Sequence, residues 1–359
     1  MLEFAAIAFV LGILIGFHEF AHLLMCKLFG VSVARFSFGF GPKLFSFRIG
    51  ETEYRIALIW LGGFVEPYSV EAKNDPGKGA DPELGTPKYK PEQCIESASA
   101  WKRCLVYLAG PFSNLFLSMA LAIGLFFFVG IPKPTLVVKE VIPNSPAAQV
   151  GIQPGDRIVS LNGAKFSSPE LFISNLQAIH GAPVWIGIVR NAVFKEFMVT
   201  PEVREISPGV RSNLIGVAFL TEEVRQGFFQ SIRYGFKFTI AVLDIFYDWF
   251  LKLFSGQMRS EETVGGPIMI GEVIVKAARR GWVELLDIMI MISMNLFFFN
   301  ILPIPLLDGG QIYPALYEVV TRRKPSIGFL RIWQLSGILF LAFLLLLGLR
   351  NDLLRLFFK

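Results

Sequence analysis

The chain has 359 residues, of which 53% are hydrophobic, and its mean hydropathy is +0.54. Ordinary soluble domains are about 45–50% apolar, so the composition excludes a typical soluble protein and indicates one that resides in the lipid bilayer. The net charge is +5. The basic residues flank the apolar runs, which is typical of membrane-topology signals and not of a nucleic-acid surface.

Four apolar runs are long enough to cross a bilayer as helices. They predict a polytopic α-helical membrane protein with about four transmembrane helices. The first run has no basic segment before it and no cleavage pattern, so it predicts a retained helix and not a signal peptide. The predicted spans cover residues 4–29, 104–130, 283–307 and 332–349.

The first span contains the sequence His18-Glu19-Phe-Ala-His22. Positions i and i+4 of a helix share one face, so both imidazoles can bind one zinc ion while Glu19 acts as general base on a metal-bound water. The alternative is a pair of hydrogen-bonded histidines beside a buried glutamate. Ionisable groups inside a span are costly and usually functional, which favours the metal site.

Short β-rich pieces at 35–47 and 54–60, broken by Gly and Pro, predict a membrane-associated β-hairpin sheet before the second span. An open sheet edge can hold a substrate in extended form by strand addition, although a plain surface hairpin fits these residues equally well. Residues 71–91 are rich in Pro, Gly, Lys and Asp and predict a loop.

After the second span the pattern changes to strand-like runs at 135–142, 184–190 and 194–200, with a helix at 169–178. About 70 residues suffice for one small β-rich domain, predicted here at 131–205, with His180 in a surface loop. The 206–282 region that follows contains an aromatic, charge-interrupted stretch at 227–254. This stretch predicts an amphipathic helix lying in the membrane interface.

A catalytic zinc has three protein ligands and one open position. Asp308 lies in an apolar run just after Pro303 and Pro305, which end the third span. At about 1.5 Å per residue, this end of the third span reaches roughly the depth of the two histidines, so Asp308 is the predicted third ligand; a helix cap is the alternative. Asn300 could hydrogen-bond a substrate or bridge two helices.

Basic residues cluster after the first span, before the second and between the third and fourth. The positive-inside rule places these stretches in the cytosol, with both termini and the 131–282 region extracytoplasmic, although Arg279, Arg280, Arg350 and Arg355 oppose this orientation. Cys26, Cys94 and Cys104 would then face the cytosol, where disulfides are rare.

The sequence resembles the site-2 protease family of intramembrane metalloproteases, especially the bacterial RseP-like group that regulates sigma-factor release. The motifs that carry the resemblance are His18–His22, Phe38–Pro42, Gly62–Val65, Ala109–Asn114, Gly265–Ile268, Asn300–Pro303 and Leu307–Gly309. They are spread over most of the chain in the family's order. They divide the chain into an N-terminal membrane core at 1–130 and a C-terminal core at 283–359.

The resemblance implies a bacterial inner-membrane zinc endopeptidase with zinc on His18, His22 and Asp308 and with Glu19 as base. Its substrates would be single-span membrane proteins, such as anti-sigma factors or signal-peptide remnants, trimmed beforehand by a site-1 protease. It implies that residues 131–205 form one PDZ domain, which acts as a size filter or binds peptide tails. The residues implied to hold the substrate strand are Asn300, Gly62, Gly63 and Phe64.

Two other functions fit parts of the sequence. One is a membrane scaffold whose PDZ domain binds partners and whose metal site is not catalytic, and the other is a zinc carrier. An intact Glu19 favours the enzyme, because neither a scaffold nor a carrier needs a base beside the ligands.

Overall fold

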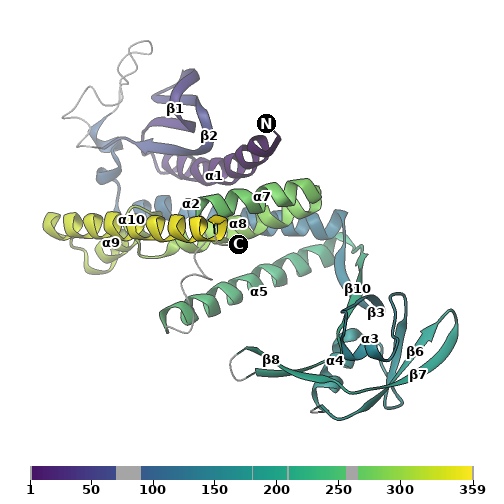
Figure 1. The fold of residues 1–359 in the computed structure, drawn as a ribbon. Coiled ribbons are helices and arrows are strands. Elements are labelled where there is room, and N and C mark those ends of the chain that lie inside the picture. The colour runs from purple at the N-terminus through teal and green to yellow at the C-terminus, as the bar shows by residue number, and fades with distance from the viewer. Residues whose placement is uncertain (1, 70–89, 180, 208–209, 256–265, 358–359) are drawn as a thin grey trace. The chain divides into compact units, whose positions relative to one another are not determined.

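The computed structural model describes residues 2–69, 90–179, 181–207, 210–255 and 266–357 (Figure 1). The chain forms two compact units. The first, the membrane unit, combines Met1–Leu125 with Phe228–Lys359, and the second, the β unit, is Phe126–Gly227. The predicted loop at 71–91 and the prediction for His180 fall almost entirely outside the described residues.

Four helices of the membrane unit are long and apolar enough to cross a membrane, and they coincide with the four predicted spans. The third ends at Ile301, before the predicted Leu307, because Pro303 and Pro305 cannot continue a helix. The elements of this unit are α1 (Leu2–Leu28), β1 (Val33–Ile49), β2 (Thr52–Pro67), η2 (Pro91–Gln93), η3 (Ile95–Ser97), α2 (Ala100–Phe128), α5 (Phe228–Phe254), α7 (Pro267–Arg280), α8 (Trp282–Ile301), α9 (Asp308–Thr321) and α10 (Ile327–Phe357).

Strands β1 and β2 form one antiparallel hairpin with several register shifts, as the β-rich pieces predicted, and its strands are longer than those pieces. The hairpin packs against α1 (Figure 1). Gly12 and Gly16 make this close approach possible, because a Cβ at either position would lie 2.9–3.0 Å from the Phe38 ring. Two glycines one turn apart thus give α1 a groove for the hairpin.

Helix α7, which the sequence analysis did not predict, packs between α1 and α8 around Val10, Leu14, Ile274 and Met289. Its N-terminus is capped from α10: the buried Asp352 carboxylate accepts 3.0 Å hydrogen bonds from the Gly266 and Ile268 amides. A carboxylate at this end satisfies amides that have no helical acceptor.

The stretch predicted as an amphipathic helix at 227–254 is helix α5. Phe246 and Phe250 of α5 contact the ring of Phe298 in α8, with centroids 5.5 and 5.7 Å apart. Its position in the membrane interface stays a prediction.

The β unit is a twisted sheet in the order β10-β3-β4-β6-β7, with β5 beside β4 and a separate β8-β9 hairpin. Its core includes Phe172, Ile158, Ile186 and Ile188. Its elements are β3 (Ile131–Val141), α3 (Pro146–Gln149), β4 (Arg157–Leu161), β5 (Ala164–Lys165), α4 (Pro169–Gln177), β6 (Val184–Arg190), β7 (Val193–Val199), β8 (Glu202–Ser207), β9 (Val210–Leu214) and β10 (Val217–Val224).

The boundary of this unit differs from the predicted 131–205. Strand β10 lies in the region assigned to 206–282, yet it pairs antiparallel with β3, Val217 opposite Val141. The pairing joins segments more than 70 residues apart, and no local pattern identifies such a partner. The unit therefore ends at Gly227.

One ion pair joins Asp156, just before β4, to Arg190, the last residue of β6. Asp156 is buried and accepts two hydrogen bonds from Arg190, of 2.6 and 2.7 Å, and one from the Gln153 amide. Burial opposes ionisation of Asp156, but these hydrogen bonds outweigh it and hold the pKa of the carboxyl below its ordinary value.

Candidate metal centre

Helix α1 places His18 and His22 on one face, as the spacing predicts. Both side chains are buried, and their Nε2 atoms lie 3.2 Å apart. Because one helix carries both residues four positions apart, the helical repeat brings the two rings to the same side of α1. Glu19 lies next to them and is half-buried.

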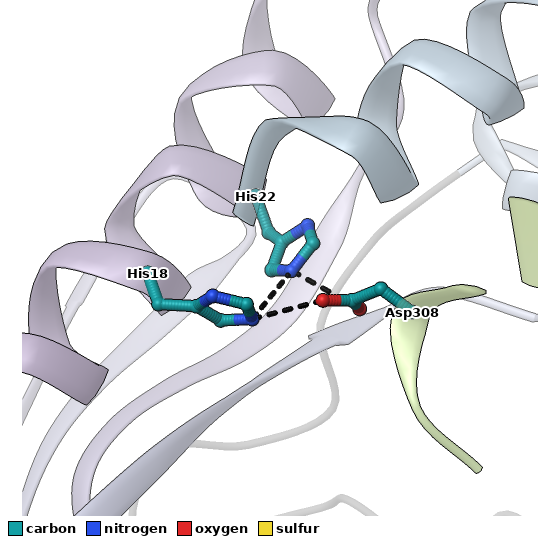
Figure 2. Close-up of side chains that lie close together, drawn as sticks. All are labelled: His18, His22 and Asp308. Carbon is teal, nitrogen blue, oxygen red and sulfur yellow. Dashed lines mark hydrogen bonds and ion pairs between the residues drawn. The ribbon is translucent and has the colours of Figure 1, made fainter. Parts of the chain in front are cut away.

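Asp308, the first residue of α9, completes the cluster. Its Oδ2 lies 2.9 Å from His18 Nε2 and its Oδ1 lies 3.3 Å from His22 Nε2. Figure 2 shows both rings and the carboxylate pointing toward one another. Among the described residues these three form the one His, Cys, Asp or Glu cluster with ligand atoms close enough to share a metal ion.

A tight turn over residues 302–310 brings Asp308 to this position. Leu306 adopts a left-handed φ of +77° within it. A Cβ on Gly309 would lie 1.8 Å from the Leu302 carbonyl oxygen, and one on Gly310 would lie 2.5 Å from the Cα of Pro305. Only glycine fits at 309 and 310, so the Asp-Gly-Gly sequence lets the first turn of α9 fold back onto the end of α8.

Hydrogen bonds from α2 fix the orientation of both rings. His22 Nδ1 lies 2.7 Å from the carbonyl oxygen of Val106. A carbonyl can only accept, so Nδ1 carries the proton in the neutral ring and Nε2 keeps its lone pair. This is the hydrogen bond expected of a metal-binding imidazole.

His18 has the corresponding partner in Asn114, which is fully buried and lies 3.1 Å from His18 Nδ1. The Asn114 Oδ1 atom has no hydrogen-bond partner in the described part of the chain. Turning the amide by 180° places Oδ1 against Nδ1, which satisfies this oxygen and leaves His18 Nε2 with a lone pair. The sequence analysis included Asn114 only in a motif; a polar residue within a span was the signal that could have identified it.

Two nitrogen lone pairs and a carboxylate at these distances repel one another unless a cation or a proton lies among them. Gly110 of α2 leaves the space for a cation. A Cβ on Gly110 would lie 2.2 Å from His22 Nε2 and 2.6 Å from His18 Nε2, close to the roughly 2.0–2.1 Å of a zinc–histidine bond. The donor set and the glycine cradle therefore fit a metal ion with three protein ligands.

The hairpin reaches Glu19 through β2. The Val65 amide donates a 3.0 Å hydrogen bond to Glu19 Oε2, and a Cβ on Gly63 would lie 3.7 Å from Glu19 Cγ. Gly62 and Phe64, which were predicted to act with Gly63, pack on Phe40, and their contact with substrate stays a prediction. Of the three predicted hairpin residues, Gly63 is the one beside the cluster.

Asn300 occupies the last turn of α8, eight residues before Asp308, and is half-buried. Its amide has no hydrogen bond to any residue in the described ranges. It is thus not committed to bridging helices within those ranges.

A helix-borne His-Glu-x-x-His pair, completed by an aspartate from a distant segment of a chain with four membrane-length helices, defines a membrane-embedded metallopeptidase. The chain belongs to the family described as "Peptidase family M50", whose sequence profile matches residues 6–344. The predicted resemblance to site-2 proteases is therefore confirmed.

Relatives match over nearly the whole chain. The "Zinc metalloprotease RasP" of Bacillus licheniformis is 28% identical over an alignment that covers 98% of this chain and 99% of that protein. A Clostridium perfringens relative, whose name marks it only as a candidate zinc metalloprotease, is 30% identical and covers 96% of this chain and 95% of its own length. Among solved structures, the PDZ domain of an SdrC-like protein of Listeria monocytogenes matches 25% of this chain and 92% of its own, with 22% identity and a TM-score of 0.22.

Proposed function

We propose that the protein is an intramembrane zinc endopeptidase that cleaves transmembrane segments, with zinc held by His18, His22 and Asp308. The observation that carries this proposal is the cluster of three ligand atoms within 4.8 Å of one another, with Gly110 leaving space beside the two imidazoles. Zinc suits two imidazoles and one carboxylate with one open position. The relatives named as zinc metalloproteases support the same ion.

When bound, zinc supplies a water activated for attack and polarises the scissile carbonyl. Glu19 is the general base. Its Oε2 is held by the Val65 amide, so Oε1 takes the proton of the attacking water and passes it to the leaving amine nitrogen. The bond formed is carbon–oxygen and the bond broken is the peptide carbon–nitrogen bond.

A transmembrane helix hides its amides in i→i−4 hydrogen bonds, so the substrate must unwind before it is cut. The outer edge of β2 near Gly63 is suited to pair with the extended segment, and the unbonded amide of Asn300 is suited to bind its backbone. The substrates are single-span membrane proteins, such as anti-sigma factors or signal-peptide remnants, after trimming by a site-1 protease.

The β unit is proposed to be an extracytoplasmic PDZ domain that restricts access by size or binds peptide tails. The chain lies in a bacterial inner membrane with both termini outside and the metal centre toward the cytosol, which the positive-inside rule supports. Cysteines introduced at Asn144 and Lys78 should react with a membrane-impermeant reagent from opposite sides. Labelling of both from the same side contradicts this orientation.

The alternative is a PDZ scaffold with a non-catalytic metal site, and Glu19→Gln separates the two. The purified protein should carry about one zinc ion, and Glu19→Gln should keep that ion yet lose cleavage of a membrane-embedded substrate by at least about 10³-fold. Glu3→Gln, in the same helix but paired with Arg279, is the matched control and should cleave normally. Undiminished cleavage by Glu19→Gln would rule out the proposed mechanism.

A further inference from the structure

Helix α9 contains a proline that removes one of its own hydrogen bonds. In an α-helix the carbonyl of residue i−4 accepts from the amide of residue i. Pro314 has no amide hydrogen, so the carbonyl of Gly310 has no helical donor, and the proline ring also pushes this carbonyl away from the helix axis. Gly310 is buried and only two residues from Asp308, so an unsatisfied carbonyl there would be costly.

The missing donor comes from another helix. The indole Nε1–H of Trp333, in α10, donates a 2.9 Å hydrogen bond to the Gly310 carbonyl oxygen. One turn further along α10, the backbone of Gly337 lies against Pro305, where a Cβ would come within 2.2 Å of the proline Cβ. Helix α10 therefore contacts the 302–310 turn at two points, Pro305 and Gly310.

The two histidines and the aspartate of the metal cluster are held in position in different ways. His18 and His22 are fixed to each other by one helix, whereas Asp308 depends on the 302–310 turn, whose backbone includes the left-handed Leu306. A side-chain donor that fills the position left by Pro314 fixes the first turn of α9, and with it the direction of the Asp308 carboxylate.

We propose that Trp333 is a positioning residue for the proposed metal centre: its indole hydrogen bond to Gly310 replaces the one that Pro314 removes and holds Asp308 against the two histidines. The inference rests on the proposed zinc site. The inference predicts that the indole N–H contributes to metal affinity only because residue 314 is proline.

The test uses the full-length protein in detergent and measures affinity for zinc by competition with a chelator, together with the visible absorption of the cobalt-substituted protein. Trp333→Phe keeps an aromatic ring to stack on Phe329 but removes the N–H, and it should weaken metal binding about tenfold, the lower end for loss of a group that orients a ligand. The control is Trp282→Phe, the same change at an exposed tryptophan of α8, which should leave both measurements unchanged.

The decisive variant is Pro314→Ala, which restores an amide donor to Gly310. In that background Trp333→Phe should weaken metal binding less than about threefold, because the carbonyl keeps its helical partner. An equal loss in both backgrounds would show that Trp333 acts by packing and would overturn the inference, as would an unchanged affinity and cobalt spectrum in Trp333→Phe. Thermal unfolding of the metal-free proteins identifies variants that merely fail to fold.

Failure of the metal site itself gives a different result. If Asp308→Ala binds zinc as tightly as the wild type does, the proposed ligand set is wrong, and the proposed role of Trp333 is then wrong as well. If zinc binding depends on Asp308 but is indifferent to Trp333, only the present inference is overturned.

Discussion

Gly110→Ala adds a single methyl group to the space where the proposed ion lies. The methyl carbon would lie 2.2 Å from His22 Nε2 and 2.6 Å from His18 Nε2. Non-bonded atoms are optimally about 3.5 Å apart, so His22 Nε2 would have to retreat by about 1.3 Å. Metal–ligand distances tolerate about 0.2 Å, and a misplacement of 1 Å can cost about 10²-fold in rate. We expect zinc content to fall from about one ion per chain to less than a tenth, and cleavage to fall at least 10²-fold.

The assay is metal analysis of the purified protein, followed by cleavage of a membrane-embedded substrate in detergent. The matched control is Gly124→Ala, in the same helix, where a Cβ meets nothing within 4 Å. Both changes stabilise the helix intrinsically by about 1 kcal/mol, so only the contact with the metal cluster distinguishes the two variants. A Gly110→Ala protein that retains both zinc and full activity would show that the ion does not lie between the two rings beside α2.

Two further predictions concern hydrogen bonds described above. Asn114→Ala should weaken zinc binding by about 10–100-fold, because His18 loses the group that orients its ring; chelator competition measures this, and unchanged affinity would mean that the ring needs no partner. In the β unit, Asp156→Asn should lower the free energy of unfolding at pH 7 by about 2 kcal/mol, since Arg190 loses its ionic partner. The Asp156 pKa is lowered on folding, so this stability is present above the ordinary aspartate pKa of about 3.9 and is lost as pH falls through the lower folded value. Hydrogen exchange of residues 126–227 in the full-length protein should therefore show the variant and wild type differing at pH 7 and converging as pH falls through the folded pKa.

The sequence predicted those features of the site that depend on local spacing. His18 and His22 share a face because of the helical repeat, and Asp308 stood out as an acid after two prolines in an apolar run. Gly110 carried no such signal, since a glycine inside a span indicates close packing without naming what approaches it. Its role follows only from the arrangement of α2 beside α1.

The same reason explains the missed features of the fold. Strand β10 pairs with β3 across more than 70 residues, and α7 has its N-terminus capped by Asp352 from the last helix. Each depends on a partner that local propensity does not specify. The hydrophobic runs, which depend on local composition and not on a distant partner, predicted the four long helices with errors of only a few residues at most ends.

The proposed ligands come from α1 and α9, but α2 and α10, which supply none, determine whether those ligands can act together. Helix α2 supplies the ring partners Val106 and Asn114 and the open space at Gly110. Helix α10 supplies the donor that Pro314 makes necessary. The imidazoles depend on the partners from α2, and the carboxylate depends on the donor from α10. Loss of the Trp333 donor on α10 should therefore change metal affinity without changing either histidine.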